Sequence, residues 1–269
     1  MIRRSSNGLA FYQFASHSGR PEVLHAVFTR IGGSSQGCFS SLNVGQLVGD
    51  DPRAVRLNHE RIFTALGISA GHVVTARQVH GGHVAIVDED DHGSVVAATD
   101  GLLTKSRGTY LLMRFADCLP LMLYDPIHQA VALAHCGWRG LLAGVVQNAF
   151  RALHQTFGSE AVETLAALGP AIGPCCYEVG PDVIQGVRHL LGRADELLVQ
   201  QPDGRVHFDL PGAVRAQLEQ LGLHHIEDSG LCTACRRAEF FSHRAEGGNT
   251  GRFAALIGLC EPGRHLGCH

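Results

Sequence analysis

A chain of 269 residues with 45% hydrophobic and 17% charged residues can bury a sizeable core, as one large domain or two small ones. Its net charge of −3 excludes the basic surface typical of nucleic-acid-binding proteins, and no apolar run reaches the roughly 20 residues of a membrane helix. Nine cysteines, an odd number, favour reduced thiols and a cytoplasmic location over a disulfide framework. The segment Gly8–Ala15 lacks a clean small-residue cleavage site, so we expect no signal peptide.

The first half of the chain is predicted to consist mainly of strands with one helix. Asp51 and Pro52 are typical of a helix start, and Gly67 of a helix end. The strands expected in this half are Leu24–Thr29, Val73–His80 with His83–Asp88 as its hairpin partner, Asp100–Thr104 and Tyr110–Phe115.

The second half mixes strands and helices. Two apolar runs, Leu119–Tyr124 and Ala130–Ala134, read as buried strands joined by the turn Asp125-Pro126. A broad apolar stripe predicts a helix over Gly140–Phe157. Further elements are expected as strands at Thr164–Leu168, Phe240–Phe241 and Arg252–Leu259, and as helices at Pro181–Leu191 and at Leu210–Leu221, which Asp209 caps. Without strict βαβ alternation, this order predicts an α+β fold in one domain.

Three residues at predicted strand ends are candidate metal ligands. Cys118 precedes one strand and His135 follows its neighbour, so they meet at one sheet edge if the strands are antiparallel. His80 ends an earlier predicted strand. One thiolate and two imidazoles suit zinc, and three protein ligands leave a fourth position open for chemistry. From spacing alone, a buried apolar thiol and two surface histidines remain the alternative.

Polar residues near these ligands are candidates for binding substrate. Arg139 stands at a predicted helix start, which favours anions, although it could equally cap the helix or pair on the surface. Arg30 lies on a glycine-rich loop with Asn43 nearby in sequence. Asp117, next to Cys118, is either a partner of a ligand histidine or a plain turn residue.

The remaining cysteines do not have the spacing of a structural zinc site. Cys232 and Cys235 make a CxxC, but a structural zinc would need a second spaced pair, and Cys175 and Cys176 are adjacent. We therefore expect no metal or redox role for this CxxC. The last two residues, Cys268-His269, are expected to lie in a frayed tail.

Several stretches together resemble the YfiH family, also called the laccase-domain or polyphenol oxidase family. They occur in the family's order between about residues 25 and 259 and form a highly specific combination. The matching pieces are Thr29–Gly33, Ser41–Gly45, Gln78–Gly81, Ala116–Pro120, His135–Gly140, Gly169–Gly173, Tyr177–Gly180 and Phe240–Arg244.

The resemblance implies a single-domain α+β sandwich of mixed β-sheets flanked by helices. Residues 24–260 would form the catalytic domain, residues 1–23 an N-terminal extension and residues 261–269 a C-terminal tail. It also implies zinc, with copper possible, bound by the residues matching His80, Cys118 and His135. We expect a monomer or weak homodimer that binds neither nucleic acid nor membrane.

Family members are described as purine nucleoside phosphorylases that also cleave methylthioadenosine and deaminate adenosine, so purine nucleosides and phosphate are the expected partners. Cys118, Arg139 and Arg30 are then the catalytic candidates, and Asn43 joins the two arginines in binding substrate. Two alternatives stay open. One is a cysteine or zinc hydrolase that edits peptidoglycan precursors, and the other is phenol oxidation by a copper-loaded protein. The chain has no H-x-H pair, which disfavours a multicopper site.

Overall fold

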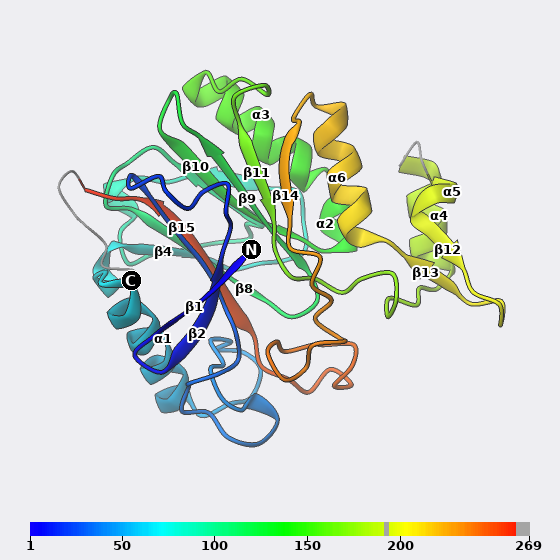
Figure 1. Ribbon diagram of the computed structural model, residues 1–269, viewed down its shortest axis with the longest axis horizontal. Coiled ribbons are helices and arrows are strands. Elements are labelled where there is room, and N and C mark those ends of the chain that lie inside the picture. Colours follow the sequence, from blue (N-terminus) through cyan, green and yellow to red (C-terminus); the bar gives the residue numbers. More distant parts are fainter. Residues whose placement is uncertain (191–193, 262–269) are drawn as a thin grey trace.

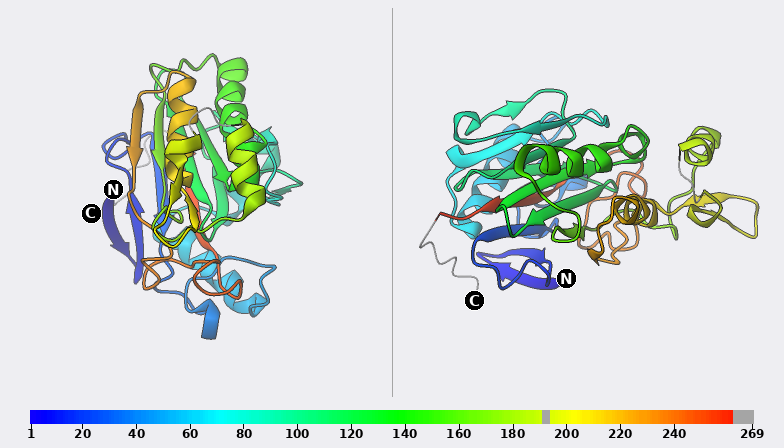
Figure 2. Two further views of the ribbon diagram at one scale, coloured as in Figure 1. Left: turned by 90° about the vertical axis from the view of Figure 1, so that its right-hand side faces the viewer. Right: turned by 90° about the horizontal axis from the view of Figure 1, so that it is seen from above.

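Two β-sheets packed face to face, with helices on both outer faces, make up the body of the protein (Figures 1 and 2). The computed structural model describes residues 1–190 and 194–261. This architecture confirms the predicted α+β sandwich of mixed sheets. None of the described helices is both long and apolar enough to cross a membrane.

The first sheet has seven strands in the order β1-β2-β3-β15-β8-β4-β6. Its members are Ile2–Ser6 (β1), Leu9–Gln13 (β2), Val23–Phe28 (β3), Phe253–Leu259 (β15), Tyr110–Phe115 (β8), Val73–Ala76 (β4) and Val95–Val96 (β6). The second sheet has six strands in the order β14-β11-β9-β10-β7-β5. Its members are His225–Asp228 (β14), Leu165–Leu168 (β11), Leu119–Asp125 (β9), Ala130–Cys136 (β10), Gly101–Thr104 (β7) and Val84–Ile86 (β5).

Side-chain alternation along the strands divides the core into three layers. In β9, Leu121 and Leu123 face the helices outside the sheet, whereas Met122 and Tyr124 face the other sheet. A third layer lies between the seven-stranded sheet and the first helix, which contributes Ile62. Strands buried on both faces read as continuous apolar runs, which is why the sequence revealed β9 and β10 so clearly.

One long helix covers the seven-stranded sheet and several cover the other sheet (Figure 1). The helices are Pro52–Leu66 (α1), Trp138–Leu142 (α2), Val145–Phe157 (α3), Pro181–Leu190 (α4), Ala194–Leu197 (α5) and Leu210–Gln220 (α6). The predicted ends of α1 are confirmed, because Asp51 accepts the N–H of Arg53 and Gly67 is left-handed. A two-stranded sheet, Leu198–Gln200 (β12) with Val206–Phe208 (β13), lies with α4 and α5 at one side (Figure 1).

Three predicted elements differ from the structure. The helix expected over Gly140–Phe157 is two helices, because Gly144 is left-handed and separates α2 from α3. The pair Phe240–Phe241 is not a strand but a buried part of a loop. The predicted hairpin of Val73–His80 with His83–Asp88 is wrong, since β4 and β5 belong to different sheets. Alternating apolar residues indicate a strand but do not identify its partner.

The structure describes the N-terminal residues of the chain but only one residue of the expected C-terminal tail. Strands β1 and β2 extend the seven-stranded sheet, so residues before position 24 contribute to it. Leu191, Cys268 and His269, and all of the expected tail except Glu261, lie outside the described residues.

Candidate metal centre and substrate pocket

The loop that crosses from one sheet to the other opens onto a cavity of about 900 Å³. This loop connects β4 to β5 and carries His80. Other walls come from the starts of β9 and α2, from the segment after β11, and from the loop before β15. The polar residues that line the cavity are Gln46, Arg77, Gln78, His80, Arg114, Asp117, Cys118, His135, Arg139, Tyr177, His243, Arg244 and Arg252.

His80, Cys118 and His135 converge on one wall of this cavity. One ligand atom from each lies within 4.8 Å of the others. The pairing of β9 with β10 is antiparallel, with His135 opposite Pro120 and Cys136 opposite Leu119. The predicted juxtaposition of Cys118 and His135 at one sheet edge therefore follows directly from the strand register.

The Asp100 carboxylate holds the loop of His80 against this edge. It accepts the backbone N–H groups of Val79 at 3.1 Å, His80 at 3.0 Å and Gly81 at 2.7 Å. His80 has a φ of 60°, in the left-handed region. Three hydrogen bonds to one ionised acceptor stabilise this unfavourable backbone conformation and aim the imidazole at Cys118.

Asp100 also fixes the second histidine. Its Oδ1 lies 2.9 Å from Nδ1 of His135, which is only 4% exposed. Burial raises the pKa of Asp100, but hydrogen bonds from His135 and Gly81 lower it overall. A carboxylate only accepts hydrogen bonds, so Nδ1 carries the proton and Nε2 is free to bind a metal.

Asp117, which the sequence suggested as a partner of a ligand histidine, instead hydrogen-bonds two neighbouring loops. Its carboxylate accepts the hydroxyl of Thr233 at 2.6 Å and the backbone N–H of Arg244 at 2.7 Å. It therefore fastens two loops next to Cys118. Sequence proximity to the cysteine pointed to the wrong aspartate, because Asp100 reaches His135 only through the pairing of β7 with β10.

The electrostatics of the three ligands favour a thiolate. Burial raises the pKa of Cys118, but the facing imidazoles, His135 above all and then His80, lower it to about 6. Burial lowers the pKa of His135, whereas the Cys118 thiolate and Asp100 raise it to about 9. Burial instead raises the pKa of the neighbouring Cys136 thiol well above its ordinary value. Cys118, unlike Cys136, is thus prepared to bind a cation.

The space between these ligands fits a metal ion. A Cβ atom at Gly137 would lie 2.8 Å from Sγ of Cys118 and 3.3 Å from Cδ2 of His80, so glycine keeps this space open. One sulfur and two imidazole nitrogens are donors that zinc and copper accept. His80 is exposed to the cavity, which leaves one side of the triad accessible.

Of the three remaining sequence candidates, Arg139 lines the cavity. Its guanidinium carbon lies 4.3 Å from the ring centroid of Trp138. Within the described part of the chain, no hydrogen bond or ion pair occupies its nitrogens, and the same is true of the cavity residue Arg77. Two guanidinium groups are therefore available to an anion.

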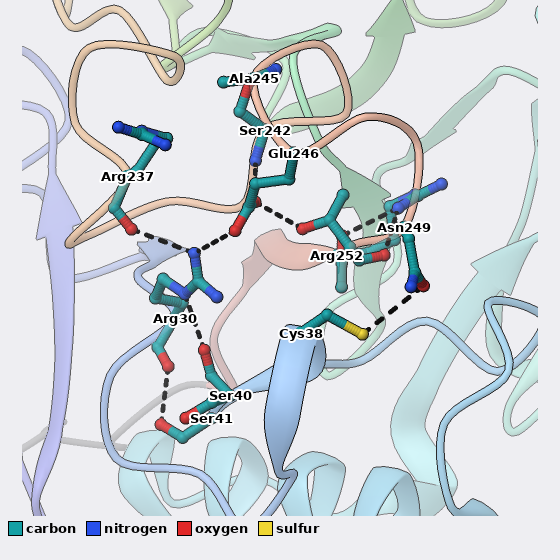
Figure 3. A network of polar contacts seen from close by, with 12 residues as sticks. Arg30, Cys38, Ser40, Ser41, Arg237, Ser242, Ala245, Glu246, Asn249 and Arg252 are labelled. Atoms are coloured by element: carbon teal, nitrogen blue, oxygen red, sulfur yellow. Dashed lines mark hydrogen bonds and ion pairs between the residues drawn. The ribbon is translucent and has the colours of Figure 1, made fainter.

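Arg30 and Asn43 are not among the residues that line the cavity. Figure 3 shows the guanidinium of Arg30 enclosed by the carbonyls of Ser40 and Arg237 and by the Glu246 carboxylate at 2.9 Å. Asn43 is fully buried, and its side-chain oxygen accepts the backbone N–H of Arg252 at 2.8 Å. Both hold loops in place next to the cavity.

Sequence reasoning did not identify several polar cavity residues. Arg77 lies next to the matched Gln78–Gly81 stretch, and Arg114 lies within a predicted strand, where it hydrogen-bonds the carbonyl of Ala76. His243 and Arg244 lie within the matched Phe240–Arg244 stretch and Arg252 at the start of a predicted strand, but neither feature assigned them to the cavity. Arg77 could have been identified from the sequence only because it directly precedes the matched Gln78–Gly81 stretch.

Comparison with known proteins links the whole assembly to one family. The family model described as multi-copper polyphenol oxidoreductase laccase matches residues 24–260. The chain is 38% identical over 243 residues to the purine nucleoside phosphorylase YlmD of Geobacillus stearothermophilus, covering 87% of this chain and 89% of that protein. It is 35% identical over 231 residues to the purine nucleoside phosphorylase YfiH of Escherichia coli K12, covering 86% and 91%.

Solved structures agree with this relationship. The crystal structure of YlmD from Geobacillus stearothermophilus superposes with a TM-score of 0.90 at 35% identity, over 96% of this chain and 98% of that chain. The Bacillus licheniformis hypothetical protein YfiH gives a TM-score of 0.88 at 32% identity, over 96% and 98%.

Proposed function

This chain belongs to the multi-copper polyphenol oxidoreductase laccase family, and we propose that it acts as a zinc-dependent purine nucleoside phosphorylase. The observation that carries the proposal is the His80–Cys118–His135 triad, open on one side to a cavity that also presents free guanidinium groups. The names of relatives at 35–38% identity support the same activity.

The residues of the triad would hold the metal, and the arginines would hold the phosphate. When bound, zinc would supply a Lewis acid at the open side of the triad. In phosphorolysis, phosphate attacks the ribose C1′ while the purine leaves, through a transition state that resembles an oxocarbenium ion. In this proposal Arg139 and Arg77 bind and orient the phosphate anion, which their position in the cavity lining supports. Asp100 keeps His135 in the tautomer that presents Nε2.

We extend the proposal to methylthioadenosine cleavage and adenosine deamination at the same site. Methylthioadenosine differs from other purine nucleosides on its sugar, so its cleavage needs the same attack at C1′. Deamination needs a water to attack C6 of the purine and ammonia to leave, at the same open side of the triad. A cavity of about 900 Å³ has room for a nucleoside together with phosphate.

Incubation of zinc-loaded protein with inosine, adenosine or methylthioadenosine, with and without phosphate, tests these activities by chromatography of the products. Hypoxanthine formed from inosine only in the presence of phosphate supports phosphorolysis. Inosine formed from adenosine without phosphate supports deamination. Failure to turn over any of these nucleosides would overturn the proposal.

Copper is the metal alternative. A His₂Cys donor set also binds copper, and copper(II) binds most nitrogen and sulfur sites more tightly than zinc does. Weak oxidation of phenols by copper-loaded protein would then be a side reaction. Metal analysis of protein produced without added copper decides between the two, because our proposal predicts zinc.

A metal-free hydrolase is the second candidate function. Cys118 is hydrogen-bonded to His135, which is in turn hydrogen-bonded to Asp100, and this is the order of a nucleophile, a base and an orienting carboxylate. A hydrolase of this kind, such as one that edits peptidoglycan precursors, would stay active without metal and would be abolished by a thiol alkylator. The proposed phosphorylase would instead lose activity when a chelator removes the metal. For either enzyme, the exposed thiols of Cys38, Cys175 and Cys235, none of which forms a disulfide, fit our proposal of a cytoplasmic location.

A further inference from the structure

We propose that Cys175, Cys176, Cys232 and Cys235 form a second, structural metal site that binds one zinc ion. Their sulfur atoms all lie within 4.8 Å of one another. Sγ of Cys235 is 3.6 Å from that of Cys175 and 3.4 Å from that of Cys176. Four thiolates around one zinc, at roughly 2.3 Å each, are about 3.8 Å apart. The cluster therefore already has the dimensions of a tetrathiolate site, and the inference does not depend on the purine activity.

Backbone hydrogen bonds hold the two cysteine pairs next to each other. An isolated parallel bridge joins Ala171 to Cys232. In it, the N–H of Ala171 donates to the carbonyl of Leu231 at 3.2 Å, and the N–H of Thr233 donates to Ala171 at 3.0 Å. The turn after Ala171 then places the adjacent cysteines beside the CxxC. Spacing along the chain concealed this site, because the second pair of ligands is separated by no residue at all.

Backbone donors point at one sulfur of this cluster, that of Cys232. The backbone N–H of Gly173 donates to Sγ of Cys232 at 3.3 Å, and the amide of Cys235 also hydrogen-bonds this sulfur. Donors aimed at a sulfur stabilise its ionised form, which is the form that binds metals. Four thiolates with tetrahedral geometry select zinc or iron among the common metals, and four protein ligands leave no open position.

Other roles for this cluster fit the geometry less well. A disulfide needs sulfurs about 2.05 Å apart, whereas Sγ of Cys235 lies 3.6 Å from that of Cys175 and 3.4 Å from that of Cys176. A redox CxxC normally opens a helix after a strand, whereas Cys232 and Cys235 lie in a turn. A closed structural metal site accounts for all four side chains at once.

A metal here would fasten one wall of the substrate cavity. Thr233, next to Cys232, donates to the carboxylate of Asp117 at 2.6 Å. The N–H of Ile172 donates to the carbonyl of Asp117 at 2.9 Å, and Ile172 and Tyr177 line the cavity. Since Asp117 precedes Cys118, the tetrathiolate site would stabilise the position of the triad cysteine without taking part in the reaction.

Zinc content per chain, measured by mass spectrometry of the purified protein, tests this inference. We expect two zinc ions in the wild type and one in a Cys232→Ser/Cys235→Ser variant. A Cys38→Ser variant is the matched control, because Cys38 is an exposed cysteine outside both clusters, and it should keep two. Equal zinc content in the wild type and the double variant would overturn the proposal, as would iron in this site.

A second measurement does not depend on how well the cysteine variant folds. A His80→Ala/Cys118→Ala variant saturated with cobalt(II) removes the first site and leaves the four cysteines intact. We expect strong thiolate-to-cobalt charge-transfer absorption, at one cobalt per chain. Absence of that absorption, or a native mass two hydrogens lower because of a disulfide among these cysteines, would contradict the site. Failure of the phosphorylase assay would leave both measurements unaffected.

Discussion

The carboxylate of Asp100 lies 2.9 Å from Nδ1 of His135 and also accepts the backbone N–H of His80 at 3.0 Å. One buried side chain thus orients both histidines of the candidate metal centre, one through its ring and the other through its backbone. The metal geometry therefore depends on a residue that does not itself bind the metal.

Replacement of Asp100 by asparagine should weaken zinc binding at the triad by about 10- to 100-fold, the usual effect of losing such a partner. The amide can present its N–H₂ group to His135 and no longer enforces the tautomer with Nε2 free. Competition with a chromophoric chelator measures the affinity directly.

The matched control is Asp125→Asn, at the other end of β9. Asp125 is also fully buried, and its Oδ2 lies 2.8 Å from Nδ1 of His128. This variant should lose stability but keep the zinc affinity of the wild type. A similar loss of affinity in both variants would show that general destabilisation, and not histidine orientation, explains the effect.

Arg139→Ala should raise the KM for phosphate about 10- to 100-fold, since a hydrogen bond to a charged group contributes about 1.5–3 kcal/mol. The KM for the nucleoside should change much less. Initial rates at varied phosphate concentration separate the two constants.

Arg30→Ala provides the contrast, because the side chain of Arg30 is engaged with Ser40, Arg237 and Glu246. We expect a lower melting temperature with little change in the KM for phosphate. If Arg30→Ala raised that KM as much as Arg139→Ala, the placement of the phosphate next to Arg139 would be wrong.

Two buried histidines outside the metal centre, His17 and His25, predict a loss of stability in mild acid. Burial lowers the pKa of His17 to about 4 and that of His25 to about 3, from an ordinary value of 6.5. The unfolded chain binds more protons below pH 6.5, so the stabilisation is complete above that pH and is lost as the pH falls toward 4. Each histidine adds up to about 1.4 kcal/mol per pH unit to the slope of the free energy of unfolding against pH.

A His17→Phe variant should therefore show about half of the slope that these two histidines contribute. Urea unfolding at several pH values, with chelator in every sample, gives the free energy of unfolding. His154→Gln, which replaces an exposed histidine, should leave the slope unchanged. Identical slopes in the wild type and His17→Phe would contradict the pKa assigned to His17.

The parts of the fold that were predictable from the sequence are those with strong local signals. Buried strands such as β9 and β10 appear as unbroken apolar runs, and α1 has a complete set of end signals in Asp51, Pro52 and Gly67. Strand pairing across the sheets depends on contacts between distant residues, so local patterns could not show that β4 and β5 separate.

In the candidate site, too, local sequence signals were predictable and contacts between distant residues were not. The spacing of Cys118 and His135 around one turn predicted their meeting, because antiparallel neighbours bring their ends together. The contribution of Asp100 depends on the pairing of β7 with β10, and the four-cysteine cluster depends on a bridge between loops about sixty residues apart. Neither has a local signature in the sequence.

Parallel assay of Cys118→Ala and Cys136→Ala tests the central claim most directly. Both cysteines belong to the same sheet edge, but Cys118 alone of the two faces His80 and His135. We predict that Cys118→Ala loses one zinc per chain together with phosphate-dependent release of hypoxanthine from inosine, while Cys136→Ala keeps both. Wild-type zinc content and full phosphorolysis in Cys118→Ala would contradict the account.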